Sequence, residues 1–320
     1  MNLWGQMAVW SLERIQVPEL WRRGLEGEHV RVGVVGTGID LSHPDFRNNT
    51  INAFSLFGSD VGDSVGHETG IVWLITRIAP RADVIVAKDR IGAYGHMHSV
   101  IDACERLREL GVQILNLSVA TDFPTDGTDP ISREVDYLAE NGVLVATAAG
   151  NKGPSYQTIG APGAAEKALT IGKANDRDQV AWDSSRGPTL DGRLKPDCVA
   201  PGARIMAASP LPLRRGLYAS FDCTSYAVPH VTGVLALLMQ AYPDITACDL
   251  KRAIMAGCEP ARPSLLSRTA GGSSLRRRLA AKVRTALASQ ADPRWNCGAG
   301  RINASRSYEV LRKNEQAGPG

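Results

Sequence analysis

The chain has 320 residues, of which 43% are hydrophobic and 22% charged, and its net charge is +3. This composition is typical of a large soluble α/β domain with a sizeable core. The small charge, without a basic stripe interleaved with aromatic residues, argues against a nucleic-acid partner. No run approaches the roughly 18 apolar residues that span a bilayer, so we also expect no membrane partner.

The N-terminal residues 1–24 contain no basic region followed by an apolar one, so we expect no export signal. Six cysteines are scattered along the chain without CxxC spacing. Free thiols are typical of proteins kept in a reducing compartment. Together these features predict a cytoplasmic protein with reduced cysteines.

Short β-branched runs alternate with amphipathic helical patterns along the chain. The predicted strands are Val30–Val35, Ala82–Lys88, Val112–Val119, Gly142–Ala149 and Ala168–Lys173. The predicted helices are Gly70–Ile78, Ser99–Leu110, Ile131–Asn141, 224–242 and Ile245–Met255. Buried strands alternating with helices predict a three-layer α/β/α sandwich with a mostly parallel central sheet. Ligand sites in such sheets lie at the carboxyl ends of the strands.

Four motifs occur in order along these elements. They are GTGIDLSHPD at 36–45, HETG at 67–70, AGN at 149–151 and CTSYAVPHV at 223–231. With the supporting segments 184–188, 194–197, 200–202 and 298–303, this series resembles the catalytic domain of subtilisin-like serine peptidases, the subtilases. The resemblance implies a subtilisin-like domain over 30–310, with an inserted loop and helix at 260–293. Residues 1–29 would then be an N-terminal extension that packs on it, and 311–320 a tail.

The resemblance assigns roles to three residues. Ser225 would be the nucleophile and His67 the base that takes its proton, since a serine hydroxyl attacks poorly without one. Ser225 also begins a helical pattern, so its backbone N–H belongs to a helix N-terminus suited to an oxyanion. The side-chain amide of Asn151 would be the second oxyanion donor.

Gly36 stands where the family motif has the aspartate that orients the base. A glycine cannot accept the imidazole N–H, hold its tautomer or stabilise the imidazolium. Loss of that aspartate alone costs subtilisin about 3 × 10⁴ in turnover. The sequence therefore predicts a slow or specialised enzyme.

Other carboxylates do not obviously replace the aspartate. Glu68 is next to His67, but adjacent residues on a helix do not face each other, so we expect no orienting role for it. Asp40 belongs to the loop of the first motif, where the family commonly has an acid too. Asp60 and Asp63 are near His67 in sequence and remain candidates.

Substrate contacts are also implied by the resemblance. The segment Ser118, Val119 and Ala120 matches an edge that pairs with extended peptide backbone, a form of β-augmentation. Ala148, Ala149 and Gly150, with 160–163, would line the pocket for the residue before the scissile bond. Residues 94–97 would supply the opposite edge.

Metal sites are not indicated. His96 and His98 are two loop histidines without further donors. Asp45 matches an acid that binds calcium in many subtilases, but the chain from Gly70 to Pro80 leaves no room for the loop that completes that site. We therefore expect no metal and no cofactor.

The sequence thus predicts a serine endopeptidase whose partner is a peptide or protein substrate. The alternative is a pseudopeptidase that binds a peptide or a partner protein without hydrolysing it. A third possibility, that Gly36 is an introduced inactivating change, ranks low because serine is the more usual target.

Overall fold

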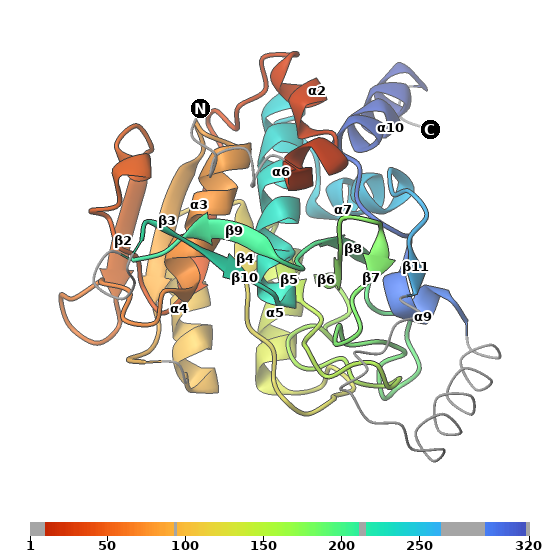
Figure 1. Ribbon diagram of the computed structural model, residues 1–320, viewed down its shortest axis with the longest axis horizontal. Coiled ribbons are helices and arrows are strands. Elements are labelled where there is room, and N and C mark those ends of the chain that lie inside the picture. Colours follow the sequence, from red (N-terminus) through yellow and green to blue (C-terminus); the bar gives the residue numbers. More distant parts are fainter. Residues whose placement is uncertain (1–9, 93–94, 211–215, 264–291, 318–320) are drawn as a thin grey trace.

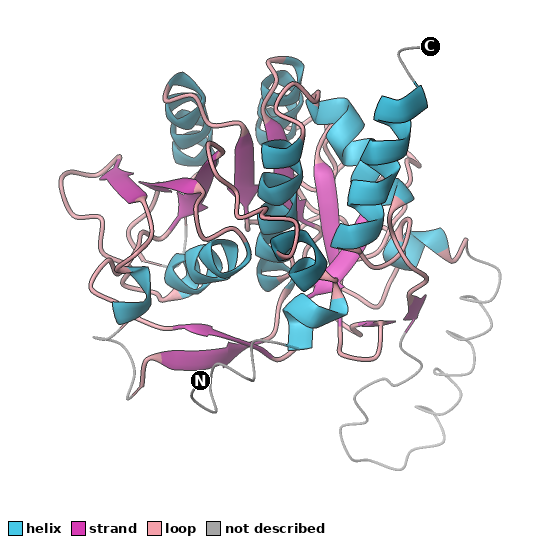
Figure 2. Cartoon of the chain, turned by 90° about the horizontal axis from the view of Figure 1, so that it is seen from above, coloured by secondary structure: helices cyan, strands magenta, loops and turns pink. Residues whose placement is uncertain are grey.

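The structure is a computed structural model that describes residues 10–92, 95–210, 216–263 and 292–317. Most of the loop and helix expected at 260–293, and Tyr94 of the expected substrate edge, lie outside these residues. The elements can be followed by label in Figure 1 and by type in Figure 2.

A central sheet of nine strands organises the described part of the chain. Its strands are β1 (Arg31–Gly36), β2 (Ile51–Ser55), β3 (Asp83–Lys88), β4 (Ile114–Leu117), β5 (Leu144–Ala148), β6 (Leu169–Ala174), β7 (Gln179–Val180), β8 (Cys198–Pro201) and β11 (Arg262–Pro263). The order is β11-β7-β6-β5-β4-β1-β3-β2, with β8 paired to β6. All pairs are parallel except β6 with β7. A separate antiparallel pair is formed by β9 (Ile205–Ala208) and β10 (Tyr218–Phe221).

Helices cover both faces of this sheet. They are α2 (Val17–Trp21), α3 (His67–Ile78), α4 (Met97–Glu109), α5 (Pro130–Glu140), α6 (Val228–Ala241), α7 (Ala247–Ala256), α9 (Arg294–Cys297) and α10 (Ala304–Ala317). One core joins α3 and α6 to one face of the sheet, and a second core joins α4 and α5 to the other. The predicted three-layer α/β/α fold is therefore confirmed.

The strands that the sequence did not predict are short or partly exposed. Strand β2 has no fully buried residue, and β8 has four residues and ends in proline. Neither shows the long β-branched run that marks a central strand. The predicted helix at 224–242 also begins later, because Thr224–Tyr226 form a 3₁₀ turn, η2, before α6 starts at Val228.

The N-terminal segment is part of the main core. Ile15, Val17 and Leu20 are fully buried in the same cluster as α3 and α6. The N–H of Ala304 donates to the carbonyl of Ile15 at 2.7 Å. Helices α2 and α10 lie next to each other in Figure 1, so the two ends of the described chain pack together.

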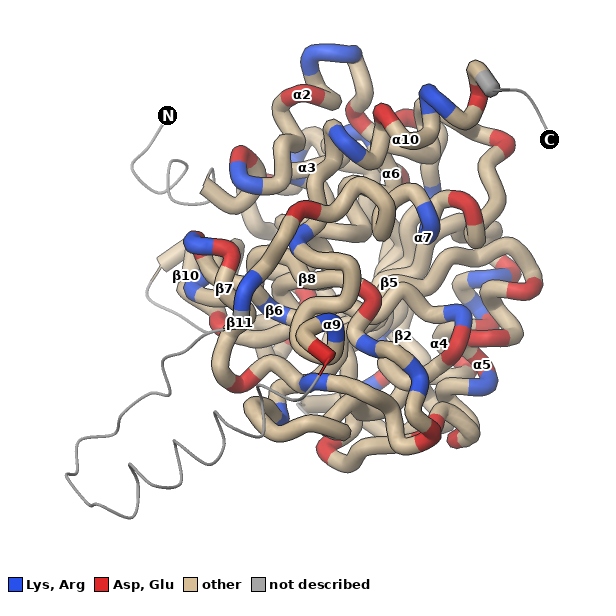
Figure 3. Tube along the Cα trace, turned by 90° about the vertical axis from the view of Figure 1, so that its right-hand side faces the viewer, with Lys and Arg blue, Asp and Glu red and all other residues tan. Residues whose placement is uncertain are grey.

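Acidic and basic residues are interspersed over the face drawn in Figure 3. All six cysteines are free, and three of them are buried. No helix within the described ranges is both long and apolar enough to cross a membrane.

A buried histidine gives the fold a defined response to acid. The ring of His230 in α6 donates from Nδ1 to the Tyr226 carbonyl at 2.8 Å, so its Nε2 accepts from the Ser11 hydroxyl at 2.8 Å. Burial lowers the pKa of His230 to about 4. In the unfolded chain the pKa of this histidine is near 6.5. Between pH 6.5 and 4 the unfolded chain therefore binds a proton at His230 that the native chain does not bind.

We therefore expect the free energy of unfolding to fall as the pH drops from about 6.5 to 4. His230→Gln should remove roughly 3 kcal/mol of that fall, the equivalent of the shift in pKa. Urea unfolding of both proteins at pH 7 and pH 4.5 measures this difference. Parallel pH dependences in the two proteins would contradict it.

Candidate active site

The predicted site residues come from separate elements that meet at one edge of the sheet. Gly36 is the last residue of β1, and Asn151 follows β5. His67 is the first residue of α3, and Ser225 lies in η2 just before α6. The sheet order places β1 and β5 on either side of β4, so their carboxyl ends open on the same edge.

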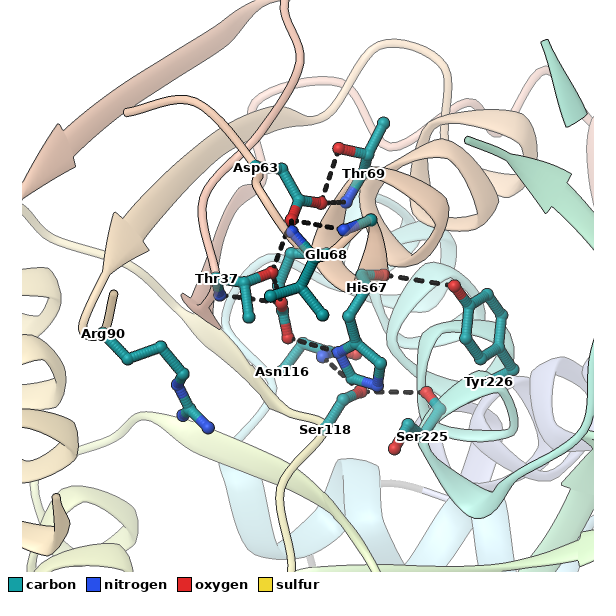
Figure 4. A network of polar contacts seen from close by, with 12 residues as sticks. Thr37, Asp63, His67, Glu68, Thr69, Arg90, Asn116, Ser118, Ser225 and Tyr226 are labelled. Atoms are coloured by element: carbon teal, nitrogen blue, oxygen red, sulfur yellow. Dashed lines mark hydrogen bonds and ion pairs between the residues drawn. The ribbon is translucent and has the colours of Figure 1, made fainter. Parts of the chain in front are cut away.

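The imidazole of His67 faces the turn that carries Ser225 (Figure 4). Its ring packs edge-on against Tyr226, with centroids 5.8 Å apart, and the Tyr226 hydroxyl donates to the His67 carbonyl at 3.2 Å. It also shares a hydrogen bond with the Cys223 thiol. His67 therefore contacts Tyr226, next to Ser225, and Cys223, two residues before it.

A chain of hydrogen bonds from the sheet and α6 holds the Ser225 turn. The Ser118 hydroxyl donates to the Ser225 carbonyl at 2.9 Å, and the Asn116 amide donates to Ser118 at 2.9 Å. Asn116 in turn accepts from Thr232 of α6 at 3.0 Å. The buried Ser118 side chain thus holds the turn that carries Ser225.

Asn151 is oriented by the same turn. Its Oδ1 accepts the Thr224 N–H at 2.8 Å, which fixes the amide so that the Nδ2 group remains as a donor. The Ser225 N–H lies in η2, directly before α6, where backbone donors of a first helical turn point outward. These two donors match the oxyanion site that the motifs predict.

Glu68 makes the contact that the sequence did not predict. Its Oε1 lies 2.6 Å from Nδ1 of His67, and its side chain is 2% exposed. The expectation that Glu68 does not face His67, and that His67 lacks a carboxylate partner, was therefore wrong. A signal was present in the sequence: the second motif gains a carboxylate where the first motif loses one.

Gly36 explains how two neighbouring helix residues meet. A Cβ built on Gly36 would lie 2.6 Å from Cγ of Glu68, and closer still to its carboxylate carbon and Oε1. Real Cβ atoms do not approach heavy atoms so closely. Because β1 has no side chain here, the Glu68 carboxylate reaches round the first turn of α3 and lies against the end of the strand.

The end of β1 also binds the second carboxylate oxygen. The Thr37 N–H donates to Oε2 of Glu68 at 2.7 Å, and the Thr37 hydroxyl is in contact with the same oxygen. That hydroxyl lies 2.7 Å from Asp63 as well. Both oxygens of Glu68 are therefore fixed by polar contacts (Figure 4).

His67 and Glu68 form an ion pair, which raises the pKa of the histidine and lowers the pKa of the glutamate. Burial alone would lower the pKa of His67, but the charge of Glu68 and the hydrogen bonds of the ring with Cys223 and Glu68 raise it to about 10. Burial would raise the pKa of Glu68. The charge of His67, its hydrogen bond to the carboxylate and the hydrogen bonds of Thr37 outweigh this effect and leave the pKa of Glu68 below its usual value. The Glu68 carboxylate thus stabilises the imidazolium.

Two further residues, Cys223 and Tyr226, contact His67. Burial raises the pKa of the Cys223 thiol, but its hydrogen bond to His67 and the charge of that ring lower it overall. Tyr226 fills the room beside Gly70, where a Cβ would lie 2.6 Å from the tyrosine hydroxyl oxygen. Sequence reasoning assigned a site role to neither residue.

The other acidic candidates have partners of their own. Asp60 pairs with Lys88 at 2.9 Å. Asp63 accepts the N–H groups of Gly66 at 2.7 Å and Thr69 at 3.0 Å, at the start of α3. Neither replaces the aspartate of the family motif.

Asp45, which matches a calcium-binding acid of many subtilases but was not expected to bind calcium here, has protein partners. The Asp45 carboxylate accepts from Trp73 at 2.6 Å and Tyr218 at 2.9 Å, and pairs with Arg77. No three His, Cys, Asp or Glu side chains of the described ranges are grouped so that they could hold a metal ion.

The predicted substrate residues differ in exposure. Val119 and Ala120 are half-buried, and within the described chain no backbone hydrogen bond engages residues 118–120. Ala149 and Gly150 are buried, and their carbonyls accept from the N–H groups of Gly160 and Ser185. Substrate contacts of all five residues remain predictions.

The comparisons with known proteins agree with this geometry. Residues 27–272 match the subtilase family model. The chain therefore belongs to the subtilase family of serine peptidases.

Individual relatives extend the similarity. Serine protease AprX of Bacillus subtilis (strain 168) is 30% identical over 292 residues, which cover 78% of this chain and 66% of the relative. Subtilisin E of the same organism is 30% identical over 264 residues, covering 78% and 65%. The chain thus spans slightly less than two thirds of these relatives.

Solved structures share the fold. The prenylagaramide maturation protease PagA has a TM-score of 0.71 at 21% identity, over 92% of this chain and 98% of its own. An alanine mutant of the PatA protease domain has a TM-score of 0.70 at 21% identity, over 91% and 98%. These likenesses confirm the subtilisin-like α/β fold.

Asn151→Ala should lower kcat by about 10²–10³ with little change in KM, because the lost amide contacts the oxyanion in the transition state and not the ground-state carbonyl. Steady-state kinetics on a chromogenic peptide measures both constants. Asn151→Asp keeps the Oδ1 acceptor for Thr224 and serves as the matched control for turn geometry. Equal kcat in the native and alanine proteins would exclude Asn151 as an oxyanion donor.

Proposed function

We propose that the protein is a serine endopeptidase that hydrolyses peptide bonds through Ser225 and His67, with Asn151 as an oxyanion donor. The observation that supports this most is the convergence of the three residues at one sheet edge in a chain of the subtilase family. Its substrate is a peptide or protein.

The arrangement supports a defined sequence of steps. The Ser225 hydroxyl attacks the scissile carbonyl while His67 takes its proton at Nε2, and the oxyanion accepts from Asn151 and the Ser225 N–H. The intermediate then expels the amine, which receives the proton from His67. Water, activated by the same base, hydrolyses the acyl-enzyme.

The reduced rate predicted from the sequence rested on a base without an acceptor for its Nδ1–H. In the structure that acceptor is Glu68. The physical reason for a slow enzyme is therefore removed, and we propose turnover comparable to that of an intact triad.

The pH dependence follows from the sign of the shift. His67 must be neutral to act as a base, and its raised pKa keeps it protonated at lower pH. We therefore propose that activity increases with pH through the neutral range and is greatest under alkaline conditions.

Fluorophosphonate labelling tests the nucleophile. We expect the native chain to be labelled at Ser225, and Ser225→Ala to lose both the label and about 10⁶-fold in kcat. Peptide mapping of the label is required because Cys223 also contacts His67. Cys223→Ala is the matched control and should retain the label.

Two outcomes would contradict the proposal. A label located on Cys223 would replace the serine by a thiol nucleophile. No label and no hydrolysis by the native chain, combined with measurable peptide affinity, would favour the pseudopeptidase.

A further inference from the structure

We infer that Glu68 is the residue that positions His67, and that Gly36 and Glu68 are two halves of one exchange. By exchange we mean that the carboxylate is supplied by Glu68 of α3, next to His67, instead of by an aspartate at position 36. Strand β1 then provides only the space that the carboxylate occupies. The inference rests on the proposed function, which it deepens by naming the third member of the catalytic group.

The first argument is the geometry of the contact. A carboxylate can only accept, so the 2.6 Å contact makes Nδ1 of His67 the protonated nitrogen. Nε2 is then left as the basic atom of the neutral ring. This is the tautomer that a base facing Ser225 requires.

The second argument is the fixed position of the carboxylate. Oε2 accepts the Thr37 N–H at 2.7 Å, so the group is held from β1 as well as from α3. With 2% of its side chain exposed, Glu68 has almost no contact with solvent. A buried carboxylate held at both oxygens has one orientation, which it transmits to the ring.

The third argument is the space at the end of β1. Any side chain at position 36 would overlap Glu68, with the Cβ 2.6 Å from its Cγ. The family motif has an aspartate at this position. The structure therefore admits a carboxylate from β1 or one from α3, but not both together.

Other charged groups around the pair are already engaged. Asp63 accepts N–H groups at the start of α3, and Lys88 pairs with Asp60. Asp89, buried after β3, is paired with Arg90 at 2.7 Å. Burial, with a smaller contribution from the charge of Glu68, raises the pKa of Asp89, and the Cys223 thiol is a further titratable group at the His67 ring.

If Gly36 were simply a lost catalytic position, restoring the aspartate of the motif would raise activity. The inferred exchange predicts the opposite. Introducing the motif aspartate alone would place a second negative charge against a buried carboxylate and force one of them to move. Gly36→Asp should therefore lower activity by about tenfold or more, and not raise it. Gly36→Asp combined with Glu68→Gly removes the overlap and should exceed either single variant.

A double-mutant cycle tests this coupling. Native, Gly36→Asp, Glu68→Gly and the double variant are compared by kcat and KM on one peptide, with circular dichroism as a check of folding. We expect both single variants to lose kcat and the double variant to regain at least part of it. Additive losses would overturn the inferred exchange.

Glu68→Gln tests the positioning role with a side chain of nearly the same shape. We expect kcat to fall by about 10⁴-fold, as when a triad aspartate becomes an amide, with KM little changed. The acid limb of the pH profile should move to lower pH, because the charge that raises the pKa of His67 is gone. Glu109→Gln, on the exposed side of α4, is the matched control and should behave as native.

A direct titration separates this inference from the proposed function. Nuclear magnetic resonance of His67 in Ser225→Ala gives its pKa without turnover, in the presence and absence of Glu68→Gln. A fall in the pKa on removing Glu68 supports the pairing even if no substrate is hydrolysed. An unchanged pKa, or full peptidase activity in Glu68→Gln, would overturn the inference while leaving Ser225 as the nucleophile.

Discussion

The hydrogen bond between Glu68 and His67 is the contact on which the rest of the site depends. It is short, buried on the side of Glu68, and formed by residues that follow one another in the chain. Two features make it possible: a strand that ends in glycine, and a threonine N–H that holds the far oxygen. The end of β1 leaves the space for the Glu68 carboxylate, and the Thr37 N–H holds it. The donor and the acceptor of the hydrogen bond both belong to α3.

The departures from the family motifs make physical sense in pairs. Gly36 makes room for Glu68, and Gly70 makes room for the hydroxyl of Tyr226. In each pair a side chain of one motif is absent and a side chain of another fills the place. Considered singly, Gly36 suggests a damaged enzyme; considered with Glu68, it belongs to a complete set of polar contacts around His67.

Apolar periodicity and motif order are local properties, so the sequence was sufficient to predict the layers of the fold. The structure brings Ser225, His67 and Asn151 to one edge of the sheet, and their catalytic roles remain predictions. The partner of His67 was missed because the rule that adjacent helix residues diverge ignores what lies beside the helix. Whether Glu68 can turn back toward His67 depends on the absence of a side chain at Gly36, the last residue of β1 and far from Glu68 in the sequence. Exposure of Val119 and burial of Ala149 likewise depend on long-range packing and were not visible in the motifs.

Because His67 and Glu68 lie on one helix, a movement of that helix can leave the hydrogen bond between them intact. If α3 slides against the sheet, the contacts with Thr37 break first, while His67 and Glu68 move together as neighbours in the same turn. When the carboxylate belongs to a strand, the same displacement pulls it away from the imidazole. In this protein the two residues that set which nitrogen of the ring is protonated therefore lie in a single helical turn. A shift of α3 would change the position of the His67 ring relative to Ser225.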